Sequence, residues 1–358
     1  MKKGLQILFS MILAITLLFS FNFESSFAQN QDKEIDISSA QKIANEYLKK
    51  IGENADTPWS KGTLEQPKKL YDLDGNLTSY IFQVKVGEID SGYMIVSAIS
   101  EFPGVLESTR EGKTPYENIK EGDAIYVGPL LHYGKEKNGN IKDLKSKKTL
   151  SKNSIKSKGP LDKHNIKNLA QKTKKQEEEL QTIYPQAISN YTNKMINGVP
   201  DYTWYLGCAP TSGANIVQYW AEHGYSRLGP DSGNMLINHL AYEMKTNSTG
   251  GTTVNNMRLG MLNFWKMKGY NPSVTTYSGT FAKHKEEILA GRPSWLTTEN
   301  HPVWTDHALT GVGVEEFYND YTLQWYRNVI VHDTWDNTPK DYWIQWSSYF
   351  DFVISIRP

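Results

Sequence analysis

The chain contains a single cysteine, Cys208, so no disulfide bond can form within it. A chain without disulfides must gain its stability from a buried apolar core. With 358 residues, of which 12% are aromatic, the chain is long enough to build such a core, and its length favours two domains. Most tryptophan and tyrosine residues follow residue 200, which predicts a large aromatic core or a peptide-binding cleft in the C-terminal half.

The N-terminus has the three parts of a secretory signal peptide. Lys2 and Lys3 form a positively charged region, residues 5–23 are an apolar run, and residues 26–28 (Ser-Phe-Ala) fit a cleavage site. We therefore predict that residues 1–28 are removed and that the protein is secreted, extracellular or associated with the cell wall, without stable membrane insertion. An uncleaved membrane anchor is the alternative, because the run approaches the roughly 20 apolar residues that span a bilayer.

Charge and motifs argue against several classes of partner. The formal net charge is zero, which gives no electrostatic reason to expect nucleic acid. The sequence has no paired-cysteine motif, no His-Glu-x-x-His motif and no glycine-rich phosphate loop. Residues 72–76 resemble the start of a calcium loop, but no glutamate completes the spacing, so we predict a hairpin turn there. We expect neither a metal ion nor a cofactor.

Residues 29–133 are predicted to form a small α+β domain. Within it, residues 37–51 place apolar side chains at helical spacings of three and four, with Ser38 or Ser39 as the N-cap. The strands predicted after this helix are residues 77–86, 92–98 and 104–108.

Residues 134–185 are predicted to be a linker. Lysine is dense over most of this segment, aromatic residues are almost absent, and Gly, Asn and Ser are scattered through it. Such a composition buries too little apolar surface to fold by itself. An exposed lysine-rich segment is also a ready target for proteases, so it is either a tether or an activation segment.

Residues 186–358 are predicted to form the second domain. Its predicted helices are residues 210–222, 254–268 and 280–290, and its predicted strands are residues 294–298, 307–314, 322–332 and 342–346. Helices that precede strands favour two lobes over alternating βαβ units. The predicted fold class is therefore α+β.

Cys208 directly follows Gly207 and lies just before the stretch predicted as the first helix of this domain. A thiol at a helix N-terminus is exposed to the positive end of the helix dipole, which lowers its pKa and favours the thiolate. This position is typical of a cysteine nucleophile. The alternative is a small buried apolar residue, as most free cysteines are.

A cysteine nucleophile needs a base and a group that orients the base. His307 starts a strand of small and apolar residues, and Asp333 follows the next strand. If the two strands pair antiparallel, Asp333 reaches His307, and the order Cys, His, Asp forms a triad. Asp306 ranks lower because adjacent strand residues point to opposite faces, and His301 is the second candidate for the base. Taken singly, His307 and Asp333 also fit structural roles.

Three strings carry a resemblance to the papain-like cysteine peptidases, and most closely to the C39-like peptidases of secreted bacterial proteins: residues 199–211, 306–313 and 332–335. The resemblance implies a two-lobe peptidase domain. It implies Cys208 as nucleophile, His307 as base and then acid, and Asp333 as the residue that orients His307. It also implies hydrolysis of peptide bonds through a thioester acyl-enzyme.

The expected oxyanion hole departs from that family. Papain-like enzymes usually carry a glutamine six positions before the cysteine, and this chain has Tyr202 there. The backbone N–H of Cys208 remains one candidate donor, and the side chains of Tyr202 and Trp204 are candidates for another, with packing as their alternative role. Loss of one oxyanion donor can cost about 10²–10³ in rate.

The N-terminal domain is similar to the propeptide of streptopain-type cysteine proteases, on residues 80–82 and 92–98. That resemblance implies a pro-domain that inhibits the enzyme or assists its folding and is released by cutting in the linker, with a fixed accessory or binding domain as the alternative. We predict a secreted cysteine peptidase, made as a zymogen, that acts on peptides or proteins. The alternatives are a cell-wall amidase or transpeptidase that uses the same triad, and a catalytically weak peptide-binding surface protein.

Overall fold

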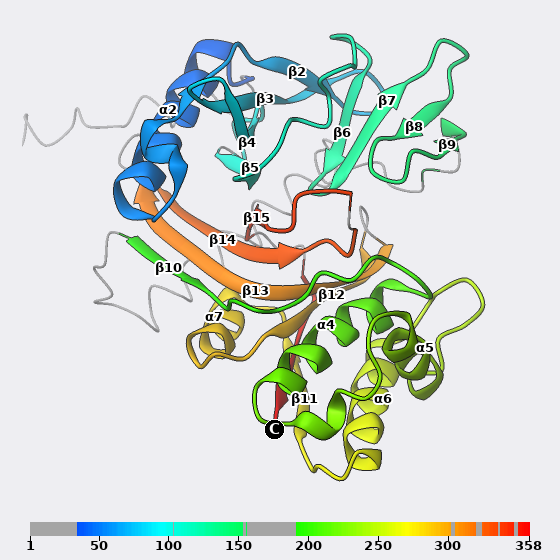
Figure 1. Cartoon of the computed structure of the whole chain (residues 1–358). Helices are drawn as coiled ribbons and strands as arrows, with labels where there is room; N and C mark the ends of the chain where they lie inside the picture. The colour runs from blue at the N-terminus through cyan, green and yellow to red at the C-terminus, as the bar shows by residue number, and fades with distance from the viewer. Residues whose placement is uncertain are drawn as a thin grey trace, which may run out of the picture. The chain divides into compact units, whose positions relative to one another are not determined.

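The computed structural model describes residues 34–102, 104–152, 155, 191–301, 305–319, 324–335, 337–346 and 350–358 (Figure 1). The described residues from Ile35 onward belong to one compact unit. The predicted signal peptide and most of the predicted linker lie outside the described residues. Within the described residues, no helix is both long enough and apolar enough to cross a membrane.

The first described helix, α2 (Ile37–Asn54), buries the face that the apolar spacing predicts, including Ala40 and Tyr47. Its N-cap is Asp36, whose carboxylate accepts a hydrogen bond from the backbone N–H of Ser39 at 2.7 Å. The prediction of Ser38 or Ser39 as the cap was wrong because Asp36, a strong N-cap residue, lies just before the first turn.

Nine strands and a short 3₁₀ helix follow among the described residues: η1 (Pro58–Lys61), β1 (Thr63–Leu64), β2 (Lys68–Tyr71), β3 (Leu77–Val86), β4 (Ile89–Ser97), β5 (Val105–Thr109), β6 (Ala124–Gly128), β7 (Leu131–Lys135), β8 (Ile141–Asp143) and β9 (Thr149–Leu150). Residues 134–150, assigned to the linker by their composition, contain the end of β7 and all of β8 and β9. Ile141 and Leu144 are buried there, which explains how so polar a segment is ordered.

The C-terminal part carries the remaining described elements: β10 (Tyr191–Met195), α4 (Cys208–Glu222), η3 (Ser226–Leu228), α5 (Asn234–Glu243), α6 (Val254–Met267), β11 (Ser273–Ser278), α7 (Phe281–Leu289), β12 (Ser294–His301), β13 (Thr305–Asn319), β14 (Gln324–His332), β15 (Tyr342–Gln345) and β16 (Phe352–Arg357). The three predicted helices correspond to α4, α6 and α7, whereas α5 was not predicted. Helices α4, α5 and α6 pack together and share one apolar core with β12 and β13 (Figure 1).

The described strands form one sixteen-stranded mixed sheet, in the order β11-β16-β12-β13-β14-β15-β5-β4-β3-β2-β6-β7-β8-β9, with β1 paired to β3 and β10 to β13. Strand β15 joins the C-terminal strands to β5, where Trp343 lies opposite Ser108 and Ile344 opposite Glu107. Helices together with this sheet confirm the α+β class. The two-lobe arrangement and a separate pro-domain remain predictions.

Apolar cores also join the N-terminal and C-terminal parts. Tyr47 of α2 packs against Phe317 of β13 and Tyr326 of β14, with ring centroids 5.7 and 6.3 Å apart. Arg110 forms an ion pair with Glu315 at 2.6 Å, and both side chains are largely buried. The two predicted domains therefore share core residues.

Candidate active site

Helix α4 starts at Cys208, and Gly207 is the residue that lets it start there. Gly207 has a φ of 155°, and a Cβ at this position would lie 2.5 Å from the carbonyl oxygen of Gly250. Only glycine permits this close approach of two backbone segments. The Thr211 hydroxyl donates to the Gly207 carbonyl at 2.7 Å, which fixes the first turn that carries Cys208.

The thiol of Cys208 lies beside the start of β13. Burial raises the pKa of the thiol, while hydrogen bonds from the backbone of Ala308, of Ala209 and of Cys208 itself lower it. The negative charge of Asp306 raises it further. Because Ala308 directly follows His307, the sulfur is adjacent to the strand segment that carries the predicted base.

His307 lies in β13 opposite Thr298 of β12, and its backbone N–H donates to the Thr298 hydroxyl at 3.0 Å. Burial lowers the pKa of the imidazole to about 3, and the positive charge of Lys145 acts in the same direction. The ring is therefore neutral at neutral pH, which is the protonation state of a general base.

Asp333 directly follows β14, which pairs antiparallel with β13 as the sequence predicts, with His332 opposite Thr310. The carboxylate is buried. Its Oδ1 accepts from the backbone N–H of Trp335 at 3.0 Å and from the Thr338 hydroxyl at 2.9 Å. Its Oδ2 lies 3.5 Å from Lys145 Nζ. Burial raises the pKa of Asp333, and Lys145 opposes this rise.

The segment before Cys208 is hydrogen-bonded to the turn after Asp333. Thr334 has a φ of 66°, a conformation that a β-branched residue rarely adopts. Its backbone N–H donates to Oδ1 of the Asp201 carboxyl group at 3.1 Å, and its carbonyl accepts from the backbone N–H of Trp204 at 2.7 Å. These two bonds hold the strained turn against the approach to α4.

The three strings that meet here lie far apart in the sequence, and a comparison with known families covers all of them. Residues 186–352 match the model described as the Peptidase_C39 like family. This part of the chain is similar to the C39-like peptidases. The matched region contains Cys208, His307 and Asp333, whereas residues 1–185 lie outside it. No curated protein matched the chain. A peptidase acts on peptide or protein substrates.

In this C39-like region, the two side chains predicted as oxyanion donors have other described contacts. Burial raises the pKa of the Tyr202 hydroxyl, and a hydrogen bond from the backbone of Gly233 lowers it. The Tyr202 hydroxyl is thus engaged by the residue that precedes α5. Trp204 is half-exposed, and its ring lies against Gly250. The oxyanion roles of Tyr202, Trp204 and the Cys208 N–H remain predictions, and the side chain of His301 lies outside the description.

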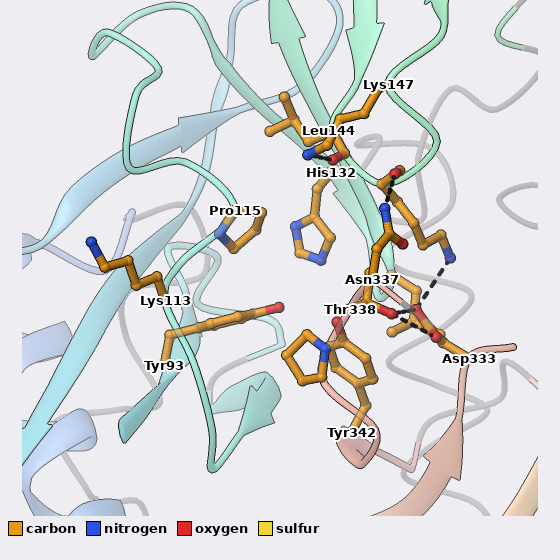
Figure 2. Close-up of a pocket in the computed structure, with 13 residues that line it drawn as sticks. Tyr93, Lys113, Pro115, His132, Leu144, Lys147, Asp333, Asn337, Thr338 and Tyr342 are labelled. Atoms are coloured by element: carbon orange, nitrogen blue, oxygen red, sulfur yellow. Dashed lines mark hydrogen bonds and ion pairs between the residues drawn. The ribbon is translucent and has the colours of Figure 1, made fainter. Parts of the chain in front are cut away.

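A cavity of about 110 Å³ lies beside Asp333, between the C39-like region and the N-terminal strands. Figure 2 shows Asp333 and Thr338 on one side of this cavity and Tyr93 and Lys113 on the other. His132, which also lines the cavity, bonds Glu107 at 2.9 Å and Tyr116 at 3.1 Å. The described residues include no cluster of His, Cys, Asp and Glu side chains suited to a metal ion.

Sequence reasoning missed two groups at the C39-like site. Asp201, whose pKa is raised to about 8 by burial and by the charge of Asp333, lies within the family-like string 199–211 and could have been found there. Lys145 gave no signal, because it lies in the segment predicted as a linker.

Proposed function

We propose that the protein is a secreted cysteine peptidase in which Cys208 is the nucleophile, His307 the base and Asp333 the residue that orients His307. The observation that carries the proposal is the contact between the Cys208 thiol and the backbone of Ala308, one residue after His307. The hydrogen bonds of Thr334 with Asp201 and Trp204 support it, because they bring the turn after Asp333 to the same place.

The chemistry follows from these positions. His307 takes the proton of the Cys208 thiol, and the thiolate attacks the carbonyl carbon of the scissile peptide bond. The backbone N–H of Cys208 donates to the oxyanion, with Tyr202 or Trp204 as the candidate second donor. His307 then protonates the leaving amine, which leaves a thioester. Water activated by His307 hydrolyses the thioester and restores the thiol.

The N-terminal part belongs to this proposal as an intramolecular inhibitor of a zymogen. The approach of Lys145 to Asp333 supports an inhibitory contact. The core that α2 shares with β13 and β14 favours a domain that stays in place over one that is released.

The test is the rate at which iodoacetamide alkylates Cys208 as a function of pH, in the wild type and in His307→Ala. At pH values below the free-thiol pKa of about 8.5, we expect His307→Ala to lower the alkylation rate, because only a paired imidazole can keep Cys208 as a thiolate at those pH values. Identical profiles would contradict the proposal and leave a binding protein on this fold. Products from a protein substrate, compared with those from cell-wall peptides, separate a peptidase from an amidase or transpeptidase.

A further inference from the structure

The turn between β8 and β9 has a fixed shape. The Asp143 carboxylate accepts from the backbone N–H groups of Lys145 at 2.9 Å and Ser146 at 3.2 Å. Lys147 has a φ of 61°, which closes the turn in the left-handed region. The turn therefore presents the side chain of Lys145 in one direction, and that side chain is only 15% exposed.

Three contacts dock this turn onto the loop that holds Asp333. Lys145 Nζ lies 3.5 Å from Asp333 Oδ2 and 5.7 Å from the ring centroid of Trp335. The Lys145 carbonyl accepts from the side-chain amide of Asn337 at 3.2 Å. Figure 2 shows Asn337 and Asp333 on neighbouring parts of this loop. The Asp333 side chain is 1% exposed, so its pairing with Lys145 is shielded from solvent.

Two other titratable groups act on Asp333, and neither is positively charged. Asp201 faces it from the segment before α4, and its raised pKa of about 8 keeps that carboxyl largely protonated at neutral pH. Tyr342 faces it from β15, and burial raises the pKa of that hydroxyl well above its usual range. Lys145 is therefore the charged group that meets Asp333 among these neighbours.

We propose that Lys145 is an inhibitory positioning residue, whose ammonium group holds the Asp333 carboxylate in a resting arrangement and disfavours a positive charge on His307. The inference rests on the proposed function and assigns its inhibition to one side chain. Activation then acts on the contact between the β8–β9 turn and Asp333.

The physical reason is electrostatic. A reactive cysteine of this class needs the thiolate–imidazolium pair, and Asp333 stabilises the imidazolium only while its negative charge is available. A cation beside Asp333 offsets the effect of that charge at His307 and repels a proton on the imidazole. The lowered pKa of His307, to which the charge of Lys145 contributes, agrees with this.

The experiment is the pH profile of Cys208 alkylation by iodoacetamide in the full chain. We expect Lys145→Gln to raise the rate at pH 6 roughly tenfold, which corresponds to a relative shift of about one pKa unit between His307 and Cys208. Lys145→Arg keeps the charge and should leave the profile unchanged. Lys148→Gln removes an exposed positive charge from the same turn and should also leave the alkylation profile unchanged.

Asn337→Ala separates charge from docking. It removes the hydrogen bond to the Lys145 carbonyl but keeps the ammonium group. An equal gain in the Cys208 alkylation rate in Asn337→Ala and Lys145→Gln would overturn the proposal, since loosening of the turn would then explain both gains. A Lys145→Gln profile that matches the wild type, in a protein with an unchanged unfolding temperature, would also overturn it.

The double variant Lys145→Gln/His307→Ala distinguishes this inference from the proposed function. The gain from Lys145→Gln must vanish in the double variant, because the thiolate then has no imidazolium partner. If His307→Ala has no effect in either background, the proposed function itself fails. If His307→Ala lowers the rate and Lys145→Gln does not raise it, only the role of Lys145 is contradicted.

Discussion

At the scale of single residues, the site depends on backbone positions that few side chains tolerate. Gly207 brings the start of α4 against Gly250, and Thr334 keeps a left-handed conformation directly after Asp333. Both positions adjoin a residue of the predicted triad. Strain of this kind persists only where surrounding contacts impose it, and here hydrogen bonds of Thr211, Asp201 and Trp204 do so.

Gly207→Ala should therefore damage both stability and reactivity. We expect a loss of about 1–3 kcal/mol from strained backbone, with further loss from the clash with the Gly250 carbonyl. The matched control is Gly224→Ala, where φ is 101° but nothing lies within 4 Å of the added Cβ. Urea unfolding and Cys208 alkylation of both variants provide the measurement. Equal effects on alkylation would show that the approach to Gly250 does not position Cys208.

His284 predicts a pH dependence of stability. It is fully buried between the Ser294 hydroxyl and the Gly313 carbonyl, and burial lowers its pKa to about 4. In the unfolded chain His284 binds a proton near pH 6.5, whereas in the folded chain it does so only near pH 4. The contribution of His284 to stability is therefore fully present above pH 6.5 and is lost as the pH falls towards 4. We expect a loss of about 2 kcal/mol between pH 7 and pH 5 from this group. His307, with a pKa of about 3, adds to the same slope.

Urea unfolding at pH 7 and pH 5 measures this slope. His284→Gln should flatten it, even though the variant is less stable overall. A slope that is the same in His284→Gln and the wild type would mean that His284 does not remain neutral in the folded state.

At the scale of helices and strands, the apolar spacing predicted α2, α4, α6 and α7 and the pairing of β13 with β14. Those predictions rested on apolar side chains that recur at helical or strand spacing within a single segment. Helix α5 was missed because it is short, and Met235 and Tyr242 are exposed on it, which weakens its apolar period. Strands β8 and β9 were missed because two to three residues cannot show an alternation. The Cys208, His307 and Asp333 candidates came from sequence, whereas Lys145 required long-range pairing that no local pattern encodes.

The ion pair between Arg110, after β5, and Glu315 of β13 predicts a large effect of mutation. Arg110→Met leaves the Glu315 carboxylate buried with the Tyr191 hydroxyl as its described neutral partner. We expect a loss of about 3–5 kcal/mol, as for other buried pairs that lose one member. Urea unfolding measures it, with Lys85→Met of the Lys85–Asp90 pair as the surface control.

The double variant Arg110→Met/Glu315→Leu should recover part of that stability, because it removes the uncompensated charge. A small loss in Arg110→Met, similar to that in Lys85→Met, would mean that water reaches Glu315 and that the pair is not buried in solution.

At the scale of the whole molecule, the pairing of β5 with β15 and the core around Tyr47 join the two predicted domains. Composition placed the division of the chain in its lysine-rich part, but composition cannot report whether the flanking parts share a core. That depends on which apolar faces meet, and the faces of α2, β13 and β14 are widely separated in the sequence.

Cleavage between residues 155 and 191 should therefore leave two pieces that stay together. We expect trypsin-treated protein to elute as one species in native size-exclusion chromatography and to separate into two in denaturant. The two pieces should stay together in native conditions because they share buried apolar area and strand pairing. Separate elution of two folded pieces under native conditions would instead support a pro-domain that is released.

The join between β5 and β15 also sets an order of events when the chain folds. Strand β5 is made early and its partner β15 close to the C-terminus, so this pairing closes a loop that contains every candidate site residue. Non-local pairing of this kind slows folding, because the entropy of loop closure is lost before the contact forms. The contact between Lys145 and Asp333 is likewise non-local, because it joins the turn between β8 and β9 to a residue close to the C-terminus. A nascent chain would therefore form the candidate site and its contact with Lys145 only late in synthesis.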